Sequence, residues 1–420
     1  MLSRREMIRN SVMIGGVAAA AHALPAWMPR LAFAQPYNNP RGDVMVVVFL
    51  RGGADSLNMI VPFGDDLYYE ARPRLAIPRP DTSGNDPKAI DLDGFFGLHP
   101  ALAPLLPLFQ GGQIRAIHAT GSPHGNRSHF EAMDFMERGV TDHHGGMTTG
   151  WVARHLATLD TGNLSPVRGI GWGAAIQTAL MGASSTIALQ SIIDYHLAGD
   201  VGFATQMMQS LMSLYQIGDE SLYQTAQNTQ SAIDLIASVD YQRYVPHNSA
   251  EYPEDDFALA LRQTAALIRA DVGLEVACID LGGWDTHTQQ GGIEGNHARL
   301  MAQLANGLAA FHQDMGTDMS KVSLVVMSEF GRRLHENANN GTDHGQGGAM
   351  LVMSGSLVVP NPVIANWAGL TPDALIDGED LAITIDYRDV LGELLRKRLH
   401  NPDVQQVFPD YDFTDIGIFG

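Results

Sequence analysis

Residues 44–58 read VMVVVFLRGGADSLN, which is seven apolar residues in a row followed by a loop with two glycines and an aspartate. A short, unbroken apolar run that ends in a turn is typical of a strand buried on both faces of a sheet. Four later stretches have the same character, and they are Ile114–Ala119, Glu275–Leu281, Val322–Ser328 and Ala349–Ser354. These stretches are predicted to be the strands of one sheet.

Helix-like stretches alternate with these strands. They are Ser128–Arg138, Gly150–Leu159, Phe257–Ala270, Asn296–Met315 and Tyr387–His400. Apolar strands that alternate with helices pack as a parallel sheet covered on both faces. The sequence therefore predicts an α/β fold, a central mostly parallel β-sheet flanked by helices, in one large domain over residues 35–420. Two helices rich in Gln, Met and Ser near residues 203–245 could be an insertion or a cap over this sheet.

The first 34 residues read as a twin-arginine signal peptide. Arg4 and Arg5 precede a mildly apolar run, and Ala32-Phe33-Ala34 forms a small-residue cleavage site before Gln35. The apolar run is short and rich in Gly and Ala, which fits a signal better than a membrane anchor or an ordinary helix. Because the twin-arginine (Tat) machinery exports folded proteins, we expect Tat as a partner and a periplasmic or extracellular location.

Charge and apolar content exclude several classes of partner. The four arginines and one glutamate of the signal give it a net charge of +3, so its removal takes the chain from −20 to −23. Nucleic acids and anionic lipids bind basic surfaces, so we expect no nucleic-acid partner. No other segment approaches the roughly 18 uninterrupted apolar residues of a membrane helix, so no stable membrane insertion is expected after cleavage. The sole cysteine, Cys278, lies in an apolar run and is expected to be a buried structural thiol rather than a nucleophile.

Polar, glycine-rich loops follow four of the predicted strands. They read RGGADSLN (51–58), TGSPHGNRSH (120–129), GGWDTH (282–287) and, between residues 328 and 345, SEFGR and then GTDHG. Ligands of open α/β sheets bind outside the carboxyl ends of the strands. We therefore expect these loops to meet around one cleft.

Two motifs in these loops have the residue types of a metal site. Asp285-Thr286-His287 and Asp343-His344 each place a carboxylate beside an imidazole, which suits a divalent metal. Asp55 could belong to the same site, or it could cap a turn, since Asp and Gly are ordinary turn residues.

Glu329 and the histidines also have two interpretations. Glu329 could join the site or form a salt bridge to Arg332 or Arg333. At most one or two of the histidines around these loops are expected to be metal ligands, the others being hydrogen-bond donors to the ligands or surface residues. These histidines are His118, His124, His129, His143 and His144.

Ser128 stands at the start of a predicted helix. With Glu131 three residues on, it could be an N-cap with a near capping box. A hydroxyl at a helix N-terminus also faces the positive end of the helix dipole, which suits a nucleophile that attacks a phosphate or sulfate ester. The two roles are compatible.

The loop motifs resemble a known family. RGGADSLNMIVP (51–62), SPHGNRSHFEAMD (122–134), GGWDTH and SEFGR with NGTDHG are similar, in the same order, to Tat-exported bacterial proteins with domain of unknown function 1501. That family is placed in the alkaline phosphatase-like superfamily of phosphatases, sulfatases and phosphodiesterases. The resemblance implies two divalent metal ions (zinc, calcium, magnesium or manganese) and Ser128 as the nucleophile. It implies as metal ligands Asp55, Asp285, His287, Glu329, Asp343 and His344. Five residues of the same loops are expected to contact these ligands or the substrate, and they are Arg51, His124, Asn126, His129 and Arg332.

The sequence also departs from the superfamily pattern. It has no Cys-x-Pro-x-Arg, so the formylglycine route of common sulfatases is excluded. Phe330 stands where the superfamily often has a metal-binding histidine, so one of two metal sites is expected to be incomplete or rebuilt from other histidines. The resemblance implies an exported metal-dependent hydrolase of a small-molecule or polymeric phosphate or sulfate ester. The alternative is a non-catalytic periplasmic binding or assembly protein on an alkaline phosphatase-like fold.

Overall fold

The structure is a computed structural model that describes residues 43–141, 146–193, 201–217, 220–357 and 361–420. The predicted signal peptide (1–34), His143 and His144 lie outside these residues. The chain divides into two compact units. The larger unit contains Arg41–Ile192 and Tyr241–Gly420, and Ile193–Asp240 belong to the smaller one.

The larger unit is built on a mostly parallel sheet with the order β13-β5-β12-β9-β1-β8-β6-β7, and β14 pairs with β5. All of these pairs are parallel except those of β12, which runs antiparallel to β5 and β9. The strands are β1 (Val44–Leu50), β5 (Ile114–Gly121), β6 (Gly169–Trp172), β7 (Thr186–Leu189), β8 (Val276–Leu281), β9 (Val322–Ser328), β12 (Gly348–Ser354), β13 (Val363–Ile364) and β14 (Ile385–Asp386).

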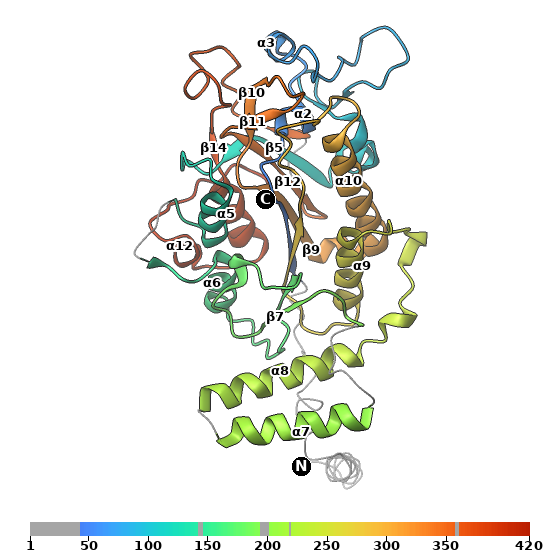
Figure 1. Cartoon of the computed structure of the whole chain (residues 1–420), viewed down its shortest axis with the longest axis vertical. Coiled ribbons are helices and arrows are strands. Elements are labelled where there is room, and N and C mark those ends of the chain that lie inside the picture. The colour runs from blue at the N-terminus through green and yellow to red at the C-terminus, as the bar shows by residue number, and fades with distance from the viewer. Residues whose placement is uncertain (1–42, 142–145, 194–200, 218–219, 358–360) are drawn as a thin grey trace, which may run out of the picture. The chain divides into compact units, whose positions relative to one another are not determined.

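Helices flank this sheet. One layer contains α5 (His129–Arg138), α6 (Trp151–Thr158), α11 (Tyr387–Glu393) with the π-helix η8 (Leu394–Arg398), and α12 (Val404–Val407). Figure 1 shows α9 (Asp256–Arg269) and α10 (Asn296–Met315) on the other side of the sheet. The α/β fold with flanking helices that the sequence predicts is confirmed.

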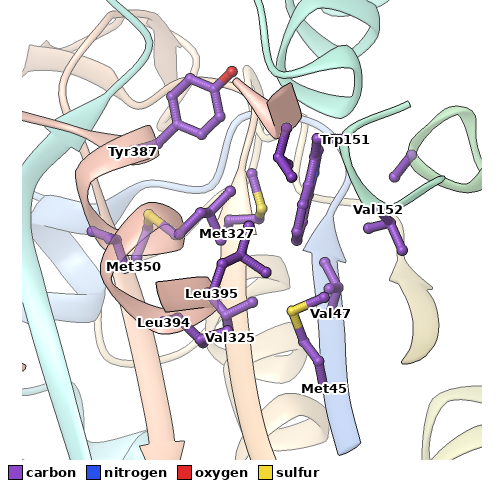
Figure 2. Packing of buried hydrophobic residues seen from close by; sticks show 14 of the residues in the cluster. Met45, Val47, Trp151, Val152, Val325, Met327, Met350, Tyr387, Leu394 and Leu395 are labelled. Carbon is purple, nitrogen blue, oxygen red and sulfur yellow. The ribbon is translucent and has the colours of Figure 1, made fainter. Parts of the chain in front are cut away.

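Alternation along the strands explains why both faces need helices. Met45 and Val47 of β1 pack with Met327 of β9 against Trp151 of α6 and Leu395 of η8, as Figure 2 shows. The residues between them in β1, such as Val46 and Val48, are also fully buried, as expected for a strand with a helix layer on each side. Cys278 lies in the same core, where burial raises the pKa of its thiol, so the expected structural role fits its surroundings.

Two strands at one end of the sheet, the edge strand β7 and its neighbour β6, were not among the predicted ones. Each has only four residues, and β6 contains two glycines (GIGW), so neither forms an apolar run long enough to recognise. The shorter elements of the unit are α2 (Ser56–Met59), β2 (Ile60–Val61), α3 (Asp66–Ala71), β3 (Ile90–Asp91), β4 (Gly97–Leu98), η2 (Pro100–Leu105), α4 (Leu106–Gln110), η4 (Thr178–Leu180), η5 (Tyr241–Arg243), η6 (His247–Ser249), η7 (Gly316–Lys321), β10 (Arg332–Glu336) and β11 (Thr342–His344).

The register of the sheet aligns the ends of β1, β8 and β9, and a polar loop follows each of these strands. Leu50 at the end of β1 is paired with Leu281 of β8 on one side and with Ser328 of β9 on the other. The loops that follow these strands therefore start side by side. After β9 the chain forms the antiparallel ribbon β10–β11, in which Arg332 is paired with His344.

The smaller unit contains α7 (Val201–Ile217) and α8 (Glu220–Ser238), at the position where the sequence predicted two helices. Across the described parts of the chain, every helix is too short or too polar to cross a membrane.

Candidate metal centre

Three imidazoles converge on one carboxylate oxygen beyond the carboxyl ends of the strands. His287 Nε2 and His344 Nε2 each lie 3.3 Å from Asp285 Oδ1, and His129 Nε2 lies 3.5 Å from the same oxygen. The atoms His287 Nε2 and His344 Nε2 are 2.9 Å apart. Single ligand atoms of His129, Asp285 and His344 all lie within 4.8 Å of one another. His129, Asp285, His287 and His344 form the His3Asp cluster.

Each member of the cluster is placed by a different part of the fold. Asp285 and His287 follow β8, His344 ends β11, and His129 is the first residue of α5. The backbone N–H of Thr342 donates to the carbonyl of Thr286 at 3.3 Å, which ties the β8 loop to the ribbon. A side chain at Gly341 would put its Cβ 2.3 Å from the carbonyl oxygen of His287, so this close approach requires glycine.

The opposite nitrogen of each imidazole faces a group that can only accept a hydrogen bond. His129 Nδ1 donates to Glu329 Oε1 at 2.7 Å, and His287 Nδ1 donates to Asp343 Oδ1 at 2.9 Å. His344 Nδ1 donates to the carbonyl oxygen of Arg127 at 2.9 Å. Since a carbonyl has no proton to give and a carboxylate is an acceptor, these contacts favour a proton on Nδ1 of each imidazole and a lone pair on Nε2.

These bonds leave three Nε2 lone pairs directed at a carboxylate oxygen. Lone pairs at 2.9 Å repel one another unless a proton or a cation lies between them. Within the described chain, His129 Nε2 is a buried atom with no hydrogen-bond partner. Histidines whose outer nitrogen is bound to a carboxylate or carbonyl are the usual arrangement of metal ligands. The donor set of the cluster therefore fits a divalent metal ion.

Arg332 lies beneath the cluster and sets the charge of Asp285. Its buried guanidinium donates from Nη2 to Asp285 Oδ1 at 2.7 Å, and from Nε and Nη1 to the carbonyls of Gly53 and Thr342. Burial alone would raise the pKa of Asp285, but the hydrogen bond and charge of Arg332 lower that pKa to about 2. Asp285 is therefore ionised at neutral pH, as a metal ligand must be.

Glu329 lies behind His129 rather than in the cluster. Its side chain is fully buried and also accepts a hydrogen bond from the backbone N–H of Gly52 at 2.8 Å. The hydrogen bond to Glu329 raises the pKa of His129, although burial opposes it. Asp343 has the corresponding place behind His287 and also accepts from Asn337 Nδ2 at 3.1 Å. The structure thus places these two carboxylates as hydrogen-bond acceptors for the imidazoles.

Asp55 is held by another partner. Both of its carboxylate oxygens accept from Arg72, at 2.6 and 3.0 Å, and Oδ2 also accepts from Gln290 Nε2 at 2.6 Å. Asp55 and Arg72 are fully buried. Burial would raise the pKa of Asp55, but the charge of Arg72 keeps that pKa below its ordinary value. A link to the cluster remains, because Gln290 Oε1 accepts from the hydroxyl of Thr342 at 2.6 Å.

Ser128 directly precedes His129 and is exposed. It is the N-cap residue of α5, yet its side chain makes no capping hydrogen bond. Its backbone N–H donates instead to Asn126 Oδ1 at 2.7 Å. The hydroxyl is therefore not committed to the helix.

The other predicted site residues have separate surroundings. Arg51 pairs with Glu137 and Asp280, at 2.7 and 2.9 Å. His124 Nδ1 accepts from the backbone N–H of Asn126 at 3.2 Å. His118 is fully buried, with its Nε2 3.0 Å from the carbonyl oxygen of Ile60, and is distinct from the cluster.

Phe330 forms an apolar wall beside two of the imidazoles. Its ring centroid lies 4.9 Å from those of both His129 and His344. Gly53 makes room for it, since a Cβ there would lie 2.5 Å from the ring. This ring has no metal-binding atom, and it stands at the position where the superfamily often has a metal-binding histidine.

Two features of the site were not recognised in the sequence. His129 was expected only to contact ligands or substrate, whereas its Nε2 belongs to the cluster; its place as the first helical residue, aimed by α5, was the available signal. The carbonyl of Arg127 and the side chain of Asn337 hold His344 and Asp343, and neither role leaves a motif in the sequence.

The chain belongs to the family of proteins of unknown function DUF1501, which it matches over residues 43–390. The family membership indicated by the loop motifs is thereby confirmed. The matched region runs from the residue before β1 to the first turn of α11 and includes every residue of the His3Asp cluster. Among curated proteins, no sequence matches this chain.

Proposed function

We propose that this DUF1501 protein is an exported metal-dependent hydrolase of a phosphate or sulfate ester, on an alkaline phosphatase-like fold. The observation that carries the proposal is the convergence of three Nε2 lone pairs on Asp285 Oδ1. A cation between these atoms would stabilise lone pairs that otherwise repel one another. One divalent metal ion would be held by His129, Asp285, His287 and His344.

The donor set favours some metals over others. Three imidazoles and one carboxylate suit zinc or manganese, whereas calcium and magnesium prefer oxygen ligands. A bound metal of this kind would act as a Lewis acid and lower the pKa of a coordinated hydroxyl or water. Glu329, Asp343 and the carbonyl of Arg127 keep the imidazoles in one orientation, and Arg332 keeps Asp285 ionised.

Ser128 is the proposed nucleophile, because its hydroxyl is exposed, free of the helix cap and next to His129. The Ser128 oxygen would form a bond to phosphorus or sulfur while the bond to the leaving oxygen breaks with its electron pair and that oxygen takes a proton. Water would then displace Ser128 from the same atom. The net reaction consumes one water, with one of its hydrogens on the alcohol and its oxygen on the acid.

Export by Tat and a periplasmic or extracellular location are part of the proposal. They rest on Arg4, Arg5 and the Ala32-Phe33-Ala34 cleavage site. Replacement of both arginines by lysine should leave the precursor in the cytoplasm. Normal recovery of that double variant from the periplasm would contradict Tat export.

The decisive experiment combines metal analysis with turnover. Protein purified without added metal should carry about one equivalent of zinc or manganese and hydrolyse an aryl phosphate, phosphodiester or sulfate. Ser128→Ala should keep the metal and lose several orders of magnitude in rate. Its stability should change by less than ~1 kcal/mol, the ordinary value of an N-cap hydroxyl, since no cap bond is present. A metal-free protein that is inactive on all three classes would rule out the hydrolase.

A non-catalytic binding or assembly protein is the second candidate, and two observations favour it. Asp55 is neutralised by Arg72, and Phe330 fills the place of an imidazole, so groups that would hold a second metal are occupied otherwise. A protein that holds one metal tightly but shows no turnover would support this candidate.

A further inference from the structure

Six arginines around the carboxyl edge of the sheet are paired with acids, whereas Arg299, in the first turn of α10, is exposed and donates to the side-chain oxygen of Asn296. Arg51, Arg332 and Arg333 follow β1 and β9, Arg127 follows β5, and Arg72 and Arg74 contact the loops beside them. Their partners, in ion pairs, are Glu137 and Asp280 for Arg51, Asp55 for Arg72, Glu336 for Arg74, Asp380 for Arg127, Asp285 for Arg332 and Glu379 for Arg333.

Several of these arginines also hold the backbone. Arg332 donates to the carbonyls of Gly52, Gly53, Thr342 and Trp284. Arg72 donates to the carbonyls of Leu334 and Arg333. Arg72 and Arg332 have no exposed side-chain surface. Their guanidinium groups cannot turn toward a substrate without losing the hydrogen bonds to the backbone carbonyls of the loops that carry the cluster.

Lysines do not supply the missing cation. The chain contains three, Lys88, Lys321 and Lys397. Lys321 precedes β9 at the amino end of the sheet, and Lys397 donates to the carbonyl of Phe419. Lys88 donates to the carbonyl of Thr82 in its own loop.

Carboxylates, in contrast, reach the solvent beside the cluster. The side chains of Asp285 and Asp343 are 48% and 49% exposed. Glu379 is 45% exposed, and Arg333, its partner, lies near enough to Asp343 to lower the pKa of that carboxyl. A substrate that approaches the cluster therefore meets negative charge from the protein.

We infer that the site takes an ester with a single negative charge at the scissile group, a phosphodiester or a sulfate monoester, and disfavours the dianion of a phosphate monoester. This inference rests on the proposed function. Enzymes that bind phosphate dianions generally use arginine or lysine clamps. Here these six arginines are already paired with acids, and a second negative charge would be repelled by Asp343, a half-exposed carboxylate that accepts from His287 and Asn337 and has no ion pair with an arginine.

Turnover gives the first test. Metal-loaded protein at pH 8 should hydrolyse bis(p-nitrophenyl) phosphate or p-nitrophenyl sulfate with a kcat/KM about tenfold or more above that for p-nitrophenyl phosphate. A monoester hydrolysed as well as both singly charged esters would overturn the inference and leave the proposed function standing.

Binding gives a second readout that does not need turnover. Calorimetric titration of the metal-loaded protein would compare methyl phosphate, a dianion at pH 8, with the singly charged methyl sulfate and dimethyl phosphate. A divalent metal without other charges would bind the dianion most tightly. If methyl phosphate binds most weakly of the three, the acidic residues of the protein must therefore repel the dianion. If methyl phosphate binds most weakly but no ester is hydrolysed, the proposed hydrolase activity is refuted and the inferred preference for a single negative charge is supported. Tightest binding of methyl phosphate would refute the preference.

A matched pair of variants locates the effect. Glu379→Gln leaves Arg333 without its carboxylate and should raise the affinity for methyl phosphate about twofold to fivefold, with less change for methyl sulfate. Asp318→Asn removes the same charge from an ion pair at the amino end of β9 and should leave both affinities unchanged. Equal effects of the two variants would mean that only the net charge of the protein matters.

Discussion

Two loops of this protein share one local pattern and differ in what they present. Gly52-Gly53-Ala54-Asp55 comes after β1, and Gly282-Gly283-Trp284-Asp285 comes after the neighbouring strand β8, one residue closer to its strand end. The loops touch, because the backbone N–H of Trp284 donates to the carbonyl of Arg51 at 3.2 Å. Yet Asp55 has no exposed side-chain surface, whereas the side chain of Asp285 is 48% exposed among three imidazoles.

The difference comes from the partners and not from the loops. Arg72, at the end of α3, donates hydrogen bonds to both carboxylate oxygens of Asp55, and both side chains are buried. Arg332 contacts only Oδ1 of Asp285 in the structure and leaves the carboxylate facing His129, His287 and His344. The same pattern thus places an aspartate after each of two strands, and residues from elsewhere in the chain decide whether its carboxylate is buried or exposed.

The sharpest contrast is expected from Asp285→Ala. This change removes the only carboxylate of the His3Asp cluster, so bound metal should be lost and turnover should fall on the order of a thousandfold or more. Metal content by mass spectrometry of inorganic elements and kcat/KM on the best ester would be measured on one preparation. Retention of a full equivalent of metal would show that Asp285 is not a ligand.

Asp55→Asn should lower the stability of the fold rather than the metal content. It leaves Arg72 as an uncompensated buried charge, which typically costs about 3–5 kcal/mol of unfolding free energy. In metal-free protein, Asp285→Asn should cost only about 1 kcal/mol, since Asp285 is half-exposed and its ion pair with Arg332 is weakened by water, unlike the fully buried pair of Asp55 and Arg72. Urea unfolding of the two variants gives the comparison, and equal losses would contradict the division between a structural and a chemical aspartate.

Acid should weaken the fold independently of the metal. Burial lowers the pKa of His118 and of His155 to about 4, below the ordinary value near 6.5. Unfolding lets these imidazoles bind protons, so their contribution is complete above pH ~6.5 and is lost as the pH falls toward ~4, by up to about 3 kcal/mol each. Urea unfolding of metal-free protein between pH 7 and pH 4 would measure this slope. A free energy of unfolding that stays constant over this range would show that these histidines do not titrate on unfolding.

The smallest effect is expected behind the cluster. Asp343→Asn weakens the acceptor for His287 Nδ1, and loss of such an outer partner typically lowers metal affinity about 10- to 100-fold. Chelator competition would measure the affinity, with Asp377→Asn as an exposed acidic control in the same unit. Identical affinities of Asp343→Asn and the wild type would mean that Asp343 does not orient the imidazole.

Much of the fold could be predicted because the signal is local. The limits of β1, β9 and α10 agree residue for residue with the predicted stretches, since each has a strong apolar period or run. The strands β6 and β7 were not predicted, because each has only four residues, too few to show a period. The sequence also placed Asp285, His287 and His344 on loops that do meet.

The tertiary structure alone determines which side chains face the His3Asp cluster and which are buried away from it. His129 faces the cluster because α5 and Glu329 aim its ring, and Asp55 is withdrawn because Arg72 arrives from another segment. Both outcomes depend on contacts between residues 17 and 200 positions apart, with no trace in the local pattern of either loop. The local sequence determines which loop carries a side chain. The exposure and the protonation state of that side chain depend on neighbours that come together only in the folded chain.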